Sequence, residues 1–180
     1  MDHIPEAARQ LLSNDIIRSM SVIDWGKAMA RCNEIIQLHL LRNAGLEAQE
    51  STVKNNNPGS DLVVQSGSRD IRIQSKLRQV NGKTPFSKQT HFETTRRHSK
   101  KNEGDKGKSG HVAYSRDEFD YVMISLIHNG ARDNVNDWHF SFIPVDDLVD
   151  PATNCCRTHI PASILKKYEW KIGQSVPFKA

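Results

Sequence analysis

The clearest pattern of hydrophobic and polar positions in the chain is a strict alternation over residues 71–78. Apolar or small residues occupy positions 71, 73, 75 and 77, and polar residues occupy 72, 74, 76 and 78, which is the two-residue period of a half-buried β-strand. A second β-rich run lies at 62–64, and residues 66–69 between the runs have the composition of a tight turn. The pattern predicts a β-hairpin in which Gln74 and Lys76 share one face and Asp61 begins the partner strand.

Two helices are expected before this hairpin. Residues 4–20 carry apolar side chains at helical spacing and are expected to serve packing only. A longer helix is expected over about residues 22–44, ended by Gly45, which can adopt the left-handed conformation that closes many helices. The apolar stripe of this second helix is predicted to consist of Ala28, Cys32, Ile35, Ile36 and His39.

The rest of the chain predicts a sheet. Residues 46–51 are expected to form a short strand, and the runs 119–127 and 138–145 are almost continuously apolar, as strands buried on both faces are. Short helices are expected at 145–149 and 162–168. This order predicts an α/β fold with a mixed central β-sheet flanked by helices, and the length of 180 residues fits a single domain, 1–180.

The charge of the chain changes along its length. Residues 1–68 carry a net charge of −2, residues 69–116 carry +9 and residues 117–180 carry −3, within an overall +4. The positive part begins at the predicted hairpin and includes the basic stretch 83–116, so nucleic acid is the expected partner. A solvated basic loop without a ligand would have the same composition.

Composition excludes several other classes. Three cysteines, two of them adjacent, provide neither a disulfide framework nor a zinc-binding spacing, which indicates a reducing cytoplasm. No apolar run is long enough to span a membrane, and the first residues do not resemble a signal sequence, so no membrane is expected as a partner. Residues 107–109 read Gly-Lys-Ser, but a P-loop needs glycine where the chain has Asn102, so no nucleotide cofactor is expected. The eight histidines lack the paired spacing of a His-metal nuclease.

The predicted hairpin brings an acid, an amide and a lysine to one place. Asp61 can supply a charged oxygen and Gln74 a neutral one, and Mg²⁺ prefers oxygen ligands of both kinds. Such an ion polarises a phosphate and lowers the pKa of a bound water. Lys76 could then orient that water or stabilise the negative charge that develops on the phosphate. This trio suits phosphodiester hydrolysis.

Asp61, twelve further residues and then Gln74-Ser75-Lys76 resemble the motif of the PD-(D/E)XK nuclease superfamily, which includes many restriction endonucleases and Holliday junction resolvases. The resemblance covers roughly residues 27–145. It departs from the common motif in two ways: Pro58 lies three residues before Asp61, and Gln74 stands where an acid is usual. The Gln-x-Lys form is similar to that of Mrr-like members.

The resemblance implies a restriction-endonuclease-like core over residues 22–145, with Asp61, Gln74 and Lys76 as catalytic residues and Mg²⁺ as the cofactor. In many members an acid on the first core helix joins the metal site, and Glu34 would take that place and restore the charge missing at Gln74. A glutamate at the solvent-exposed edge of a helix explains Glu34 equally well.

The basic segment supplies the expected DNA contacts. Lysine and arginine side chains would hold phosphates, and glutamine, threonine and arginine could read base edges. The residues expected to contact nucleic acid are Arg72, Arg78, Lys83, Lys88, Gln89, Thr90, His91, Arg96 and Arg97.

The function predicted from these features is a Mg²⁺-dependent, sequence-specific endonuclease of the type II restriction kind, acting on double-stranded DNA as a homodimer. Two alternatives remain open. The chain could be a structure-specific or repair nuclease, such as a junction resolvase. It could also be a non-catalytic DNA-binding module on a degenerate nuclease fold, because Gln74 removes one charge from the metal site.

Overall fold

The computed structural model describes residues 22–51, 60–80, 92–93, 95–97, 111–128, 134–157 and 159–178. The helix predicted over residues 4–20 and most of the basic segment lie outside these ranges.

A six-stranded sheet forms the centre of the fold, in the order β1-β2-β3-β7-β8-β12. All neighbouring strands run antiparallel except β3 and β7, which are parallel, so the sheet is mixed as predicted. The strands are β1 (Glu47–Glu50), β2 (Leu62–Ser66), β3 (Arg69–Val80), β7 (Tyr121–His128), β8 (His139–Pro144) and β12 (Glu169–Trp170).

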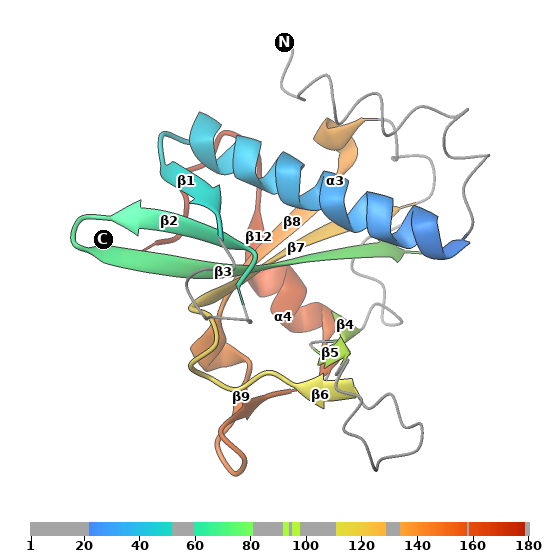
Figure 1. Ribbon diagram of the computed structural model, residues 1–180, viewed down its shortest axis with the longest axis vertical. Coiled ribbons are helices and arrows are strands. Elements are labelled where there is room, and N and C mark those ends of the chain that lie inside the picture. The colour runs from blue at the N-terminus through green and yellow to red at the C-terminus, as the bar shows by residue number, and fades with distance from the viewer. Residues whose placement is uncertain are drawn as a thin grey trace, which may run out of the picture.

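Two α-helices flank this sheet on opposite faces. The long helix α3 (Val22–Asn43) crosses one face, and the short helix α4 (Ala162–Lys167) lies on the other (Figure 1). Each face has its own apolar cluster: Ile36, Ile73 and Phe142 belong to the cluster under α3, and Ile124 and Leu165 to the one beside α4. The structure thus has the predicted α/β class, with the predicted order of helix, hairpin, connecting segment and two buried strands.

Smaller elements surround α4 and the lower part of the sheet in Figure 1. Three two-stranded pairs lie there: β11 with β4, which are distant in sequence, and β5 with β6 and β9 with β10, which are consecutive strands. These strands are β4 (Phe92–Glu93), β5 (Thr95–Arg97), β6 (His111–Ala113), β9 (Val149–Asp150), β10 (Cys155–Cys156) and β11 (His159–Ile160). Two 3₁₀ turns, η2 (Val135–Asp137) and η3 (Val145–Asp147), flank β8, and η3 occupies part of the helix expected at 145–149.

The turn chemistry of the predicted hairpin is confirmed. Ser66 pairs with Arg69, so Gly67 and Ser68 alone form the turn, and Gly67 has a φ of +61°. Glycine adopts this backbone region without the strain that most other residues meet, and the same holds for Gly45, with a φ of +84°, just after the end of α3.

The buried face of α3 differs from the predicted stripe. Ile35 and His39 are only partly buried, and Asn33 and Gln37 are among the most buried residues of the helix, at 1% and 0% exposure. Hydrophobic periodicity alone cannot place polar residues inside, because a buried amide is stable only where it finds hydrogen-bond partners. Those partners lie on the strands below the helix, as described in the next subsection.

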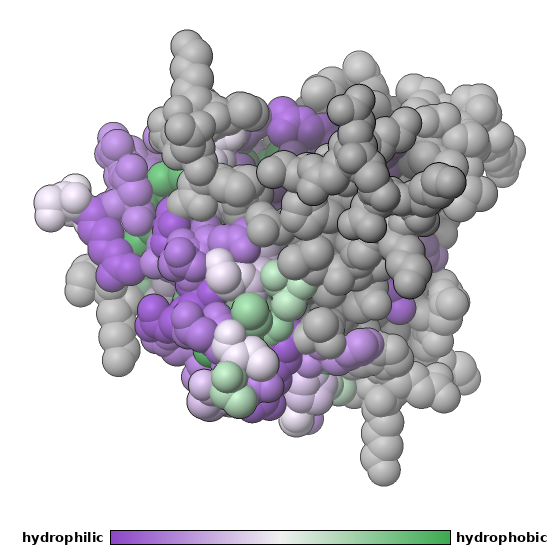
Figure 2. Space-filling model, turned by 60° about the horizontal axis from the view of Figure 1, so that its bottom comes forward, coloured by the Kyte–Doolittle hydropathy of each residue, from purple (hydrophilic) through white to green (hydrophobic). Residues whose placement is uncertain are grey.

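The surface of the described residues is mainly polar. Figure 2 shows one face of the molecule, on which hydrophilic residues predominate and hydrophobic residues form small separate patches. Among the described residues Ile172 is the one large hydrophobic side chain that is exposed, at 39%. Neither of the two described α-helices combines the length and apolar character that a membrane span requires.

Substitution of Ile143 should show how strongly the sheet depends on the cluster beside α4. Ile143 has no exposed surface, so Ile143→Ala leaves a cavity and should lower the free energy of unfolding by about 2–5 kcal/mol. The same substitution at exposed Ile172 should cost less than about 1 kcal/mol. Urea denaturation of both variants measures the difference, and equal losses would contradict the burial described here.

Candidate functional site

Asp61 lies at the point where β2 begins, directly beside the middle of β3. Its backbone N–H donates to the Ile73 carbonyl oxygen at 3.0 Å, and its carbonyl oxygen accepts from the Ser51 N–H at 2.9 Å. One carboxylate oxygen, Oδ2, accepts a hydrogen bond from the backbone N–H of Ser75 at 2.9 Å. The hairpin register therefore fixes the carboxylate against β3 through main-chain groups.

Gln74 completes the contact that the sequence predicts between the two strands. Its side-chain amide Nε2 donates a short hydrogen bond to Asp61 Oδ2, and it lies 3.3 Å from the Ser75 carbonyl oxygen. Gln74 is 5% exposed, so this amide is a buried partner of the carboxylate. To offer its oxygen to a cation beside Asp61, the amide group would turn over about its terminal bond, as amides can.

Lys76 stands on the same face of β3 as Gln74, as the alternation predicts. Its ammonium Nζ donates to the hydroxyl of Tyr114 at 2.8 Å and lies 5.0 Å from the centroid of that ring. Tyr114 is 4% exposed and belongs to the apolar cluster beside α4. The sequence analysis did not identify Tyr114, because no local pattern links it to Lys76.

A chain of buried amides and hydroxyls lies beneath the site, on the face covered by α3. Asn33 Nδ2 donates to Ser75 Oγ at 2.8 Å, and Gln37 Nε2 lies 3.4 Å from Asn33 Oδ1. Gln37 Nε2 also donates to the Met123 carbonyl oxygen at 3.1 Å and to Ser125 Oγ at 2.9 Å. These contacts tie α3 to β3 and β7 at the position of Asp61, and the sequence analysis did not identify Asn33 or Gln37.

Glu34 lies on α3 and is held by an ion pair. Arg31 Nη1 donates to Glu34 Oε2 at 2.9 Å, and Arg31 Nη2 donates to both carboxylate oxygens of Glu50 at 2.8 and 3.0 Å. Glu34 is partly buried, at 27% side-chain exposure. Its charge acts on Asp61, since Glu34 is among the groups that raise the pKa of that carboxyl.

The pKa of Asp61 is raised from its ordinary value of 3.8 to about 6. Burial is the largest cause, because it disfavours the charged form, and the nearby negative charge of Glu34 adds to it. The Ser75 N–H, the positive charge of Lys76 and the Gln74 amide oppose the shift and hold the carboxylate form. The structure therefore brings the other three predicted catalytic residues, Gln74, Lys76 and Glu34, into hydrogen-bond or electrostatic contact with Asp61.

The donors around Asp61 fit a hard cation. Asp61 and Glu34 offer carboxylate oxygens and Ser75 offers a main-chain oxygen, while Gln74 would offer its amide oxygen only after the amide turns over. Mg²⁺ prefers oxygen ligands of these kinds over the ligands of softer metals. Within the described residues no group of three or more histidine, cysteine, aspartate or glutamate side chains is suited to hold a metal. A cation site here would consist of Asp61, with Glu34, Gln74 and the Ser75 carbonyl oxygen as the further donors.

The residues predicted to contact DNA are described only in part. Arg72 is engaged within the protein: its Nε lies 3.3 Å from Asp120 Oδ2, and Nη1 donates to the Asp117 carbonyl oxygen at 2.7 Å. Arg78 is exposed, two residues beyond Lys76 on β3. Arg96 and Arg97 lie in β5. Outside the described residues lie Lys83, Lys88, Gln89, Thr90 and His91.

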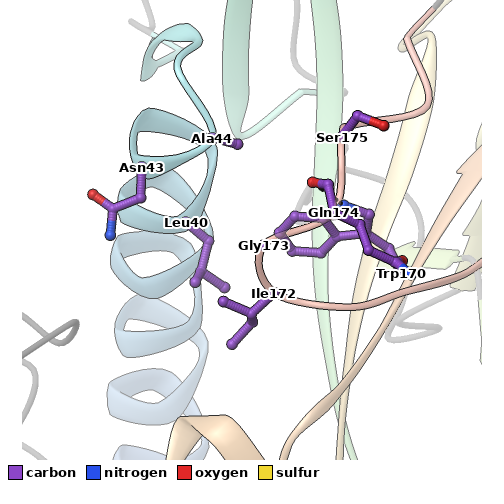
Figure 3. A pocket seen from close by; sticks show the side chains of 8 residues that line it. All are labelled: Leu40, Asn43, Ala44, Trp170, Ile172, Gly173, Gln174 and Ser175. Atoms are coloured by element: carbon purple, nitrogen blue, oxygen red, sulfur yellow. Dashed lines mark hydrogen bonds between the residues drawn. The ribbon is translucent and has the colours of Figure 1, made fainter. Parts of the chain in front are cut away.

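A pocket of about 640 Å³ lies elsewhere, between the end of α3 and the chain after β12 (Figure 3). Glu34 and Asn43 are nine residues apart on α3, or about 13 Å along the axis, so this pocket is separate from the site at Asp61. None of its lining residues is ionisable, so it offers no acid or base for catalysis. They are Leu40, Asn43, Ala44, Trp170, Ile172, Gly173, Gln174 and Ser175.

Comparison with known proteins adds a likeness at the level of structure. No protein-family model matches the chain, and no curated protein matches its sequence. Among solved structures it is similar to Hjc, a Holliday junction resolvase from the archaeal hyperthermophile Archaeoglobus fulgidus, with a TM-score of 0.44 and 14% sequence identity over 80% of this chain and 92% of that one. A likeness of this degree does not carry function from one protein to the other, so the functional argument rests on the side chains described above.

The raised pKa of Asp61 makes a prediction about stability. Between about pH 4 and pH 6 the folded protein keeps a proton on Asp61 that the unfolded chain has released, so the contribution of this carboxyl to stability falls as pH rises through this range. Asp61→Asn removes the charge and should raise the free energy of unfolding at pH 7.5 by on the order of 2 kcal/mol relative to wild type, and should change it little below pH 4.

Urea denaturation at the two pH values measures this difference. Asp70→Asn is the matched control, because Asp70 is an exposed carboxylate in the same hairpin, and it should leave stability nearly unchanged at both pH values. The same effect of Asp61→Asn at pH 4 and pH 7.5 would show that the carboxyl is not buried as described.

Proposed function

We propose that this protein is a divalent-cation-dependent endonuclease that hydrolyses phosphodiester bonds in DNA. The observation that carries the proposal is the convergence of Asp61, Gln74 and Lys76 on β2 and β3, with a carboxylate that burial makes receptive to positive charge. The +9 segment that begins on the same hairpin supports a polyanionic substrate.

Each residue has a distinct part in the proposal. Asp61 and Glu34 provide the charge that holds the cation, and Gln74 and the Ser75 carbonyl oxygen provide neutral ligands. When bound, the cation polarises the phosphate and activates water. Lys76 provides the positive charge next to the phosphate as negative charge develops on its oxygens. Ser75, through its backbone N–H, holds Asp61 in the orientation that the site requires.

Two forms of DNA are candidate substrates under this proposal. The sequence prediction favours a specific sequence in linear duplex DNA, cut by a homodimer, and its alternative is a branched DNA junction. The solved structure reported above is named for its action on Holliday junctions. Both kinds of DNA therefore belong in the assay, and Mg²⁺ is the cation to test first because all the proposed ligands are oxygens.

A second candidate function follows from the Gln74 contact. The amide nitrogen of Gln74, and not its oxygen, meets Asp61, and Glu34 already has an ion-pair partner in Arg31. A domain with this arrangement could bind DNA through its basic segment without cleaving it. Retarded DNA mobility that weakens with salt, without cleavage in any divalent cation, would favour this function.

Cleavage by the purified protein is the direct test. Incubation with plasmid DNA and with synthetic four-way junctions should give products in Mg²⁺ and none in EDTA. Lys76→Ala should lower the cleavage rate by about 100-fold or more, because it removes the charge beside the phosphate. Discrete plasmid fragments would indicate sequence recognition, and cleavage of junctions alone would indicate a resolvase-like nuclease.

Lys166→Ala is the matched control for this experiment. Lys166 is an exposed lysine on α4, so its loss should leave cleavage at the wild-type rate. Wild-type rates in both variants, or cleavage that persists in EDTA, would contradict the proposed site.

Gln74→Glu tests the cation site without measuring cleavage. The substitution places a second carboxylate against Asp61, and the repulsion should lower the melting temperature at pH 7.5 in EDTA. Millimolar Mg²⁺ should then raise the melting temperature of this variant more than that of wild type, because the ion binds the folded state and relieves the repulsion.

Gln79→Glu is the control on the same strand, since Gln79 is exposed. It should respond to Mg²⁺ as wild type does. An equal response to Mg²⁺ in all three proteins would indicate that no divalent cation binds beside Asp61.

A further inference from the structure

From the contact between Lys76 and Tyr114 we infer that Tyr114 is a positioning residue that holds the ammonium of Lys76 in place for the cleavage reaction. The inference rests on the proposed function. Its basis is the 2.8 Å hydrogen bond from Lys76 Nζ to the Tyr114 hydroxyl, in a tyrosine that is 4% exposed.

A lysine beside a reacting phosphate needs such a partner. Its side chain has four flexible methylene groups, and it loses rotamer entropy, about 2 kcal/mol on burial, when it is fixed in one geometry. A rigid aromatic hydroxyl that accepts from the ammonium lowers that cost at the time of reaction, because the lysine is already ordered. The contact is made on the face of β3 that also carries Gln74, so the ordered ammonium stays beside the candidate cation site.

Tyr114 is itself held firmly. Its carbonyl oxygen accepts from the Cys156 N–H at 2.7 Å, and its ring packs edge-on against Phe119 with 5.3 Å between ring centroids. The turn that follows is fixed by Glu118, whose Oε1 accepts from the Ser115 N–H at 2.9 Å. The backbone contact and the ring contact thus fix where the hydroxyl lies, and the Glu118 contact holds the turn that follows. A fixed hydroxyl is what a positioning residue requires.

Tyr114 also stands where the basic segment joins the site. It directly follows β6, the strand that pairs with β5 and so with Arg96 and Arg97. Tyr114, which orders Lys76, therefore lies next to the strand that pairs with part of the basic segment. This placement connects the predicted DNA-contacting segment to the candidate chemistry through a single residue.

Tyr114→Phe removes the hydroxyl and keeps the ring against Phe119. In the cleavage assay we expect kcat to fall by about 10-fold, since the lost hydrogen bond involves a charged group, with KM for DNA within about twofold of wild type. Tyr168→Phe is the matched control. Tyr168 directly follows α4, and its hydroxyl bonds to Asp147 on η3, near Lys167. Loss of this hydroxyl should leave both kcat and KM unchanged.

Lysine side-chain NMR tests the inference without DNA or cation. The Cε and Hε resonances of Lys76, assigned by their loss in Lys76→Ala, should be distinct from those of exposed lysines such as Lys166 in wild type. In Tyr114→Phe they should move to the exposed-lysine positions. A Lys76 resonance that is already at those positions in wild type, or that does not move in the variant, would overturn the inference.

The two readouts separate this inference from the proposed function. If wild type cleaves no DNA but Lys76 is ordered through Tyr114, the proposed function fails and the contact stands as a structural one only. If wild type cleaves, Lys76→Ala does not, and Tyr114→Phe cleaves with wild-type kcat, the nuclease proposal holds and Tyr114 has no positioning role.

Discussion

Burial of the Asp61 carboxylate is the constraint on which the candidate site depends. A buried carboxylate loses its hydration. Two hydrogen-bond donors, the Ser75 backbone N–H and the Gln74 amide, replace part of it, while the negative charge of Glu34 adds repulsion. The negative charge of Asp61 is therefore incompletely compensated at neutral pH, as its raised pKa of about 6 indicates. Such a site can recover free energy by taking up a proton or a cation, which gives a binding function a physical basis within the fold.

The elements that hold Asp61 in this state are tied together by buried polar side chains. Ser75 N–H belongs to the backbone of a central strand, and its side chain accepts from Asn33, which neighbours Gln37. Gln37 in turn reaches β7, so one helix and two strands are joined by polar contacts in a core where apolar packing alone would allow slippage. The network fixes the register of α3 over the sheet, and with it the position of Glu34.

The sequence was sufficient to predict what depends on local pattern and not what depends on distant partners. The alternation over residues 71–78 identified β3 and the face shared by Gln74 and Lys76, and glycines marked the turn at Gly67 and the end of α3. The burial of Asn33 and the contact of Tyr114 with Lys76 could not be predicted, because each depends on a partner 38 or more residues away. Residue type gives no guide to such pairs, since asparagine and tyrosine are common on surfaces.

The parallel pairing of β3 with β7 has a consequence for where this chain tolerates insertions. Parallel neighbours cannot be joined by a tight turn, so the chain must cross over between Val80 and Tyr121, and the crossover consists of residues 81–120. Lengthening such a connection costs little conformational entropy. Insertions between β5 and β6 should therefore cost little stability and leave Asp61, Gln74 and Lys76 in place on the hairpin.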